Sequence, residues 1–209
     1  MKNKKQMAVM LFICLIPMIV GIILYPQIPD KIVTHWNFNG EPNGWSSKLV
    51  GVIIMPLVLT VLTLFMPKLL AMDPTNKDMD YKLKNCIIWI IPIITFVCSS
   101  LTLLSALGKQ VKIEVIIPMI AGLIIAIMGN YMPKAKQSYT VGIKLPWTLN
   151  DEENWNKTHR LGGFVFVLGG LAIAISSLFE CRGVIMMASL LSMIFIPIIY
   201  SYMLYRNKI

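Results

Sequence analysis

Six long apolar runs decide what this sequence can fold into: 7–25, 49–67, 86–107, 113–132, 161–179 and 184–205. Each reaches the length of about 18 residues at which an apolar helix crosses a bilayer. Within these limits the one charged residue is Glu114, close to the end of its run. Backbone groups in hydrocarbon must find hydrogen-bond partners inside their own segment, so each run should be a helix. The sequence therefore predicts an all-α integral membrane protein, a single membrane domain over 1–209 with six transmembrane helices.

The positions of the basic residues predict which loops face the cytoplasm. Cytoplasmic connections of membrane proteins are enriched in Lys and Arg. Fourteen of the nineteen Lys and Arg residues lie in the N-terminal tail, the second and fourth connections and the C-terminus. We therefore expect both termini, and the segment 133–160, to be cytoplasmic, and the loop 26–48 to be extracytoplasmic. The same pattern explains the formal charge of +9 without direct binding of nucleic acid.

The spans lack the residues on which intramembrane chemistry depends. Ion-coupled transporters usually carry ionisable side chains inside the bundle, and no span centre has one. The two histidines, His35 and His159, fall on opposite sides of the expected topology, so they cannot share a metal. No catalytic triad context, CxxC pair or phosphate-binding glycine loop is present. We expect a protein that is not an enzyme, with no catalytic residues, no cofactor and no metal.

The loop 26–48 is the first of two polar stretches that carry recognisable patterns. Residues 33–38 have strand-like content, and Asn39-Gly40 and Asn43-Gly44 are both strong turn signals. The sequence predicts a compact, folded-back loop with its Trp residues at the membrane interface. It is either a solvated cap on the bundle or a surface that meets something arriving from outside. The candidate recognition residues are His35, Trp36, Asn37, Gly40, Glu41, Pro42, Gly44 and Trp45.

The second polar stretch, 142–163, separates the fourth and fifth apolar runs. Asn150 is a good N-cap, the acids 151–153 follow it, and Lys157, His159 and Arg160 come later. This order predicts a short amphipathic helix that runs into the fifth span. The charges can form a salt-bridge cluster among Lys144, Arg160 and the acids, or a docking platform for a cytoplasmic partner. The candidate docking residues are Lys144, Pro146, Trp147, Thr148, Glu152, Trp155, Thr158, His159 and Arg160.

Glycines in the fifth apolar run predict where helices approach closely. Gly162 and Gly169 are seven residues apart, as are Gly163 and Gly170, so each pair lies along one side of a helix. Small residues at such positions let a neighbouring helix pack tightly. We expect a packing seam within the bundle, with a dimer contact as the alternative.

Both polar stretches resemble one family. The pattern His35-Trp36-Asn37, then Gly40-Glu41-Pro42, Gly44 and Ser47-Lys48, is similar to a membrane domain of unknown function that precedes the SdpI-type domain. The pattern Gly142-Ile143, Pro146-Trp147-Thr148-Leu149, Glu152, Trp155, Thr158-His159-Arg160 and Gly163 resembles the signature of the SdpI/YfhL family of bacterial membrane proteins. The resemblance divides the chain into an N-terminal membrane segment, 1–70, and an SdpI-like region, 86–209. Lys144 stands where Arg is expected in many relatives, and it keeps the charge without the bidentate reach.

This resemblance implies a multi-pass protein of the bacterial cell membrane that confers immunity. Its implied partners, besides membrane lipid, are a secreted SdpC-type toxin outside the cell and a cytoplasmic ArsR-type autorepressor, which it would hold at the membrane as a signal receptor. The outer loop would then meet the toxin and the inner segment the repressor. The alternative is a small permease-like or exporter-like member of the same family without a toxin partner.

Overall fold

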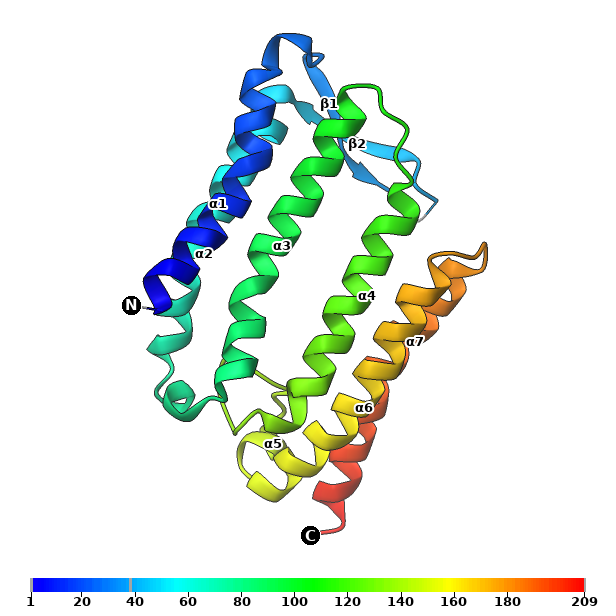
Figure 1. Cartoon of the computed structure of the whole chain (residues 1–209). Helices are drawn as coiled ribbons and strands as arrows, with labels where there is room; N and C mark the ends of the chain where they lie inside the picture. The colour runs from blue at the N-terminus through cyan, green and yellow to red at the C-terminus, as the bar shows by residue number, and fades with distance from the viewer. Residues whose placement is uncertain (1, 38, 209) are drawn as a thin grey trace. The chain divides into compact units, whose positions relative to one another are not determined.

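The computed structural model describes residues 2–37 and 39–208, and within them six helices are long and apolar enough to cross a membrane (Figure 1). They are α1 (Lys2–Ile23), α2 (Met55–Met72), α3 (Tyr81–Ala106), α4 (Ile113–Tyr131), α6 (Glu152–Ser176) and α7 (Arg182–Arg206). Helix α2 continues a π-helical turn, η2 (Val50–Ile54). Short helices lie in the connections: η1 (Tyr25–Gln27), η3 (Pro74–Asp78), η4 (Met132–Lys134) and α5 (Pro146–Leu149). The six predicted helices are confirmed, and the chain is a multi-pass membrane protein.

The chain forms two compact units, which are described one at a time. The first comprises Met1–Pro67 and Ile88–Ile117, and the second comprises Lys68–Ile87 and Pro118–Ile209. Helices α3 and α4 each contribute one end to either unit.

The first unit has its buried core beneath a β-hairpin. Strands β1 (Lys31–Trp36) and β2 (Pro42–Ser47) are antiparallel, and within the described residues they form the only sheet. Ile32 of β1 is buried with Ile28, Val52 and Leu103, so the hairpin is packed onto the ends of the membrane helices. Lys48 fixes the base of the hairpin, because its ammonium pairs with Asp30 at 3.0 Å. The predicted folded-back loop with strand-like content is confirmed.

The second unit is organised around α6, which forms a hairpin with α7 (Figure 1). A Cβ on Gly170 would lie 2.6 Å from the amide nitrogen of Ala126 and from the carbonyl oxygen of Gly122, both in α4. Gly163 lies about two turns before Gly170 in α6, and a Cβ there would lie 2.7 Å from the carbonyl oxygen of Gly129 in α4. The predicted seam is therefore a packing contact inside the bundle, where two backbones touch.

The other glycine pair of α6 faces a different neighbour. A Cβ on Gly169 would lie 2.4 Å from the methyl group of Met193 in α7, and one on Gly162 would meet Ile143. The two pairs thus allow α6 to pack closely on two sides.

Candidate functional site

The turn of the β-hairpin is built by Asn37. Its side-chain oxygen accepts the amides of Asn39 (2.9 Å) and Glu41 (3.0 Å), and its amide nitrogen donates to the Glu41 carboxylate (2.8 Å). Gly40 closes the turn with φ +81°, a conformation that favours glycine. Its α-carbon also lies close to Glu114 in the first turn of α4, where a Cβ would come 2.5 Å from the carboxylate. Asn39-Gly40 is therefore a turn, as predicted.

Asn43-Gly44 is not a turn, and that part of the prediction was wrong. Both residues lie inside β2, where Gly44 pairs with His35. A Cβ on Gly44 would lie 2.8 Å from the Cβ of His35, so the glycine makes room for the histidine. The His35 ring is hydrogen-bonded through Nδ1 to the side-chain oxygen of Asn43 at 2.5 Å. This cross-strand pair fixes the ring on the surface of the hairpin.

The hairpin presents an aromatic surface to its surroundings. The Trp45 side chain is 60% exposed, His35 is exposed and Trp36 is half-buried. Asn37, Gly40 and Gly44 set the turn and the strand pairing, and the exposed Glu41 carboxylate accepts the Asn37 amide. The accessible side chains that remain for recognition are those of His35, Trp36, Pro42 and Trp45. We call these four residues the hairpin surface.

The second candidate surface belongs to the segment 133–160, which a buried carboxylate ties to the connection between α2 and α3. Asp73 is 7% exposed and accepts the amides of Thr75 (2.9 Å) and Tyr139 (3.1 Å). The hydroxyls of Thr75 and Thr140 donate to it as well. These donors, the Thr75 hydroxyl foremost, hold the pKa of Asp73 far below its usual range. The carboxylate is therefore ionised, and it anchors the loop 138–140.

Trp155 and His159 form the buried centre of this segment. The Trp155 indole donates to the carbonyl of Ala135 (2.7 Å), and its ring stacks on the His159 ring. His159 Nε2 accepts the amide of Ile143 (2.9 Å), so the proton of the ring sits on Nδ1, which donates to the carbonyl of Trp155 (2.8 Å). Both nitrogens are used, and the imidazole is held neutral. Gly142, at φ +126°, lies against both rings where no side chain fits.

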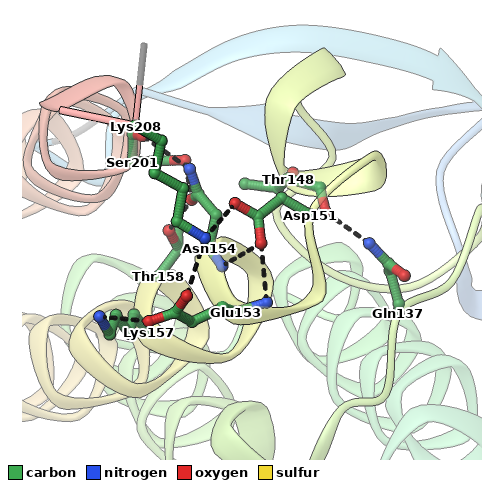
Figure 2. Close-up of polar contacts among 9 residues, drawn as sticks. All are labelled: Gln137, Thr148, Asp151, Glu153, Asn154, Lys157, Thr158, Ser201 and Lys208. Atoms are coloured by element: carbon green, nitrogen blue, oxygen red, sulfur yellow. Dashed lines mark hydrogen bonds and ion pairs between the residues drawn. The ribbon is translucent and has the colours of Figure 1, made fainter. Parts of the chain in front are cut away.

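A second buried network joins α6 to the end of α7 (Figure 2). The side-chain oxygen of Asn154 accepts the hydroxyls of Thr158 (2.9 Å) and Ser201 (2.8 Å), and its amide nitrogen donates to the Ser201 carbonyl (3.0 Å). Ser201 also accepts the indole N–H of Trp147 at 2.7 Å. The Trp147 ring then stacks on Tyr205. Helix α7 is thus hydrogen-bonded both to α5 and to the first turn of α6.

The N-cap of α6 is Asp151, and the assignment of that role to Asn150 was wrong. Asp151 accepts the amides of Glu153 (3.0 Å) and Asn154 (3.2 Å), whereas the Asn150 side chain donates to the carbonyl of Pro146 (2.9 Å). The predicted helix is confirmed, and it continues without a break into the fifth span.

The charges around this cap do not pair as the proposed salt-bridge cluster required. Among the described residues, Lys208 bridges Asp151 and Glu153 at 2.8 Å each, and Lys157 pairs with Glu153 at 2.7 Å (Figure 2). The Lys208 ammonium lowers the pKa of the Asp151 carboxyl. Lys144 instead donates to the backbone carbonyl of Tyr139 at 3.2 Å.

Burial divides the predicted docking residues into two groups. Thr148, Trp155, Thr158 and His159 are buried and hydrogen-bonded within the protein, and Trp147 is half-buried. Lys144, Pro146, Glu152 and Arg160 are exposed. With Glu153, Asn156 and Lys157, the exposed residues Glu152 and Arg160 form a face that we call the α6 polar stripe. Direct contact with a partner is open to the exposed residues, and the role of the whole set stays a prediction.

Sequence reasoning did not identify several residues of this site: Asp73, Asn76, Ser138, Thr140, Asn154, Ser201 and Lys208. One signal was present, because Asp followed by Pro at positions 73 and 74 is a typical helix start. Ser201 and Lys208 meet the segment only after α7 has folded back, and no local pattern reveals that. Among the described residues, no group of three His, Cys, Asp or Glu side chains gathers as a metal site.

Two family models match parts of the sequence that include the two candidate surfaces. The model of a domain of unknown function, DUF1648, matches residues 12–60, and that of the SdpI/YfhL protein family matches residues 134–201. The chain is 31% identical to "Immunity protein SdpI" of Bacillus subtilis (strain 168) over 208 residues, which cover 98% of this chain and 97% of that protein. No solved structure matches the chain significantly.

Proposed function

Because the chain belongs to the SdpI/YfhL family, we propose that it protects a bacterial cell against a secreted toxin of the SdpC type. We further propose that it signals, by holding an ArsR-type autorepressor at the membrane when toxin is present. It acts by binding and not as an enzyme. The observation that carries the proposal is the similarity to an immunity protein along almost the whole of both chains.

The hairpin surface is proposed to meet the toxin. Trp45 and His35 are exposed on a hairpin that is held rigid by the Asn37 turn and by burial of Ile32. Rigid, exposed aromatic residues give much contact area at little cost in conformational entropy. The proposal places this hairpin on the extracytoplasmic side, the side expected for a loop with few basic residues.

The α6 polar stripe, together with Lys144, is proposed to meet the repressor on the cytoplasmic side. Its side chains project from a helix whose other faces are fixed by Trp155, His159 and Asn154. A surface carrying both signs of charge can select a partner through complementary charges. The buried residues of the signature then position this surface.

Toxin challenge of a sensitive strain tests the outer surface. Expression of the wild-type chain should restore growth, and the double variant His35→Ala, Trp45→Ala should lose this protection at an unchanged membrane level. Tyr139→Ala removes a similarly exposed ring from the segment 133–160 and is the control. Full protection by the double variant would refute the assignment to the hairpin, and no protection by the wild type would favour the exporter-like alternative.

Recruitment of the repressor tests the inner surface. A fluorescent repressor should move to the membrane in toxin-treated cells and stay in the cytoplasm when Lys144, Glu152 and Arg160 are all changed to Ala. Lys109→Ala with Lys112→Ala, exposed lysines of the third connection, is the control. Recruitment that survives the triple variant would rule out docking at this surface, while retained toxin protection in that variant would show that the two roles separate.

A further inference from the structure

A cavity lies where α2 ends and α3 begins, within the second compact unit. Its volume is about 100 Å³, and its lining residues are Leu70, Ala71, Asn76, Lys77, Met79 and Lys84. One wall is apolar and comes from the last turns of α2. Two lysines also line it, Lys77 of η3 and Lys84 in the first turn of α3. The cavity therefore combines hydrocarbon and positive charge.

The wall formed by Asn76 is rigid and has its hydrogen bonds satisfied. The Asn76 amide nitrogen donates to the carbonyl of Leu70 (2.9 Å) and to the hydroxyl of Thr140 (2.6 Å). Its oxygen lies 2.9 Å from the Ser138 hydroxyl. Asn76 thus shapes the cavity, and among the described side chains that line it the charged groups are the ammonium groups of Lys77 and Lys84.

Two nearby carboxylates whose side chains the structure describes, Asp73 and Asp80, are hydrogen-bonded to other groups. Asp73 is enclosed by the donors of Thr75, Tyr139 and Thr140. Asp80 accepts the amides of Lys82 (2.9 Å) and Leu83 (3.0 Å) and so caps α3. Neither lines the cavity.

The cavity lies at the level where apolar surface gives way to polar connections. The Met72 side chain, at the last residue of α2, is 76% exposed, and Leu69 is also exposed. Tyr81, at the first residue of α3, is exposed as well, and tyrosine is enriched where membrane meets water. A phospholipid whose acyl chain lies beside Leu69 and Met72 would have its head group near the two lysines.

We propose that this cavity binds the phosphate of an anionic phospholipid head group, with Lys77 and Lys84 as its ligands and the apolar end of α2 beside its acyl chains. Basic pockets between membrane helices on the cytoplasmic side bind anionic lipid head groups. This connection carries four lysines on the expected cytoplasmic side, where the leaflet is negatively charged. Lipid binding here is a property of the membrane-bound protein that does not depend on toxin or repressor.

Native mass spectrometry of the detergent-purified full chain, titrated with phosphatidylglycerol or with phosphatidylcholine, tests the proposal. Phosphatidylglycerol should be retained preferentially, and Lys84→Gln should weaken its binding by about fivefold, the value of one charge near an anionic membrane surface. Lys82→Gln removes the same charge two residues away, outside the cavity, and should leave binding unchanged. Lys77→Gln with Lys84→Gln should lose binding further, whereas Lys4→Gln with Lys5→Gln should retain it.

Three results would overturn the proposal. Equal weakening by the cavity and control variants would indicate diffuse attraction to basic residues. Equal retention of the two lipids would exclude charge recognition. Displacement of phosphatidylglycerol by millimolar inorganic phosphate would show a site for free anions. All the lysines changed are solvent-accessible, and an unchanged thermal midpoint in phosphatidylcholine would confirm that each variant is folded.

Discussion

The imidazole of His159 lies nearly flat on the indole of Trp155, with ring centroids 3.9 Å apart and both side chains fully buried. Each ring also makes a backbone hydrogen bond to a different part of the preceding segment, at Ala135 and Ile143. This pair therefore holds the segment 133–149 against the start of α6. In the proposed function, this pair positions the exposed residues around it.

Replacing Trp155 should unfold this segment. Trp155→Ala removes a fully buried indole and its hydrogen bond, and the expected cost is about 3–5 kcal/mol of unfolding free energy. A fall in the thermal unfolding midpoint of the purified protein would measure it. Arg160→Ala, on the same helix but exposed, should leave the midpoint unchanged. Equal midpoints for the two variants would contradict the structural role of Trp155.

A methyl group at Gly170 should disturb the contact between α4 and α6. It would lie 2.6 Å from backbone atoms of Gly122 and Ala126, which cannot move away as a side chain can. Gly170→Ala should therefore cost about 1–3 kcal/mol of stability, typical of overpacking. At Gly183 a Cβ would have nothing within 4 Å, so Gly183→Ala is the matched control. The thermal unfolding midpoints of both variants would test this. An unchanged midpoint for Gly170→Ala would mean that α4 and α6 do not pack as closely as described here.

Two further glycines separate backbone strain from crowding. Gly40 and Gly108 both have positive φ, at +81° and +73°, but only Gly40 has a neighbour, the Glu114 side chain. An alanine should cost about 1–2 kcal/mol at either position because of the left-handed backbone. Gly40→Ala should cost more stability than Gly108→Ala, and adding Glu114→Ala to Gly40→Ala should remove the difference. Chemical unfolding of the three variants would test this, and identical losses at the two glycines would argue against the contact with Glu114.

The ionised state of Asp73 should appear in the pH dependence of stability. Its pKa is lowered in the folded protein, so its contribution is complete above the ordinary aspartate pKa of about 4 and is lost as the pH falls toward the folded pKa. Asp73→Asn should be less stable at neutral pH and should show a flatter stability profile between about pH 5 and 3. Unfolding midpoints across that range would measure both effects. A wild-type profile as flat as that of the variant would show that the carboxylate is not held ionised.

Ser201 should matter more than the ion pairs beside it. Ser201→Ala removes the acceptor of the Trp147 indole and a donor to Asn154, both in a buried network, at a cost of about 1–3 kcal/mol. Lys208→Gln breaks two exposed pairs and should leave the thermal midpoint unchanged, because such pairs contribute little. A larger fall for Lys208→Gln than for Ser201→Ala would reverse this ranking.

The helices were predictable because length and hydropathy alone demand them. A bilayer leaves an apolar run no other way to satisfy its backbone, and 113–132 was placed within one residue of α4. Helix ends were less well predicted, since polar residues such as Tyr81 and Lys82 extend α3 beyond its apolar run.

The details of the polar segments depended on contacts that no local pattern contains. Asn39-Gly40 and Asn43-Gly44 carry the same turn signal. The chain turns at the first, whereas the second lies in β2, where Gly44 packs against His35. Asn150 and Asp151 are both good caps, and a bond to Pro146 occupies the former. The bond between Asp73 and Tyr139 joins residues 66 positions apart, and it forms only after the helices between them have packed.

The hydrogen bonds between Ser201 and Asn154 have a practical consequence for labelling this protein. A reporter fused behind Lys208 would be attached to α7, which is hydrogen-bonded to Asn154 and Asp151 at the start of α6. Motion of the reporter would strain these hydrogen bonds. The turn between α6 and α7 offers a neutral attachment point, because Gly183 has open space around it and Cys181 there is exposed. A probe inserted at this turn would follow the protein in cells while leaving both candidate surfaces unaltered.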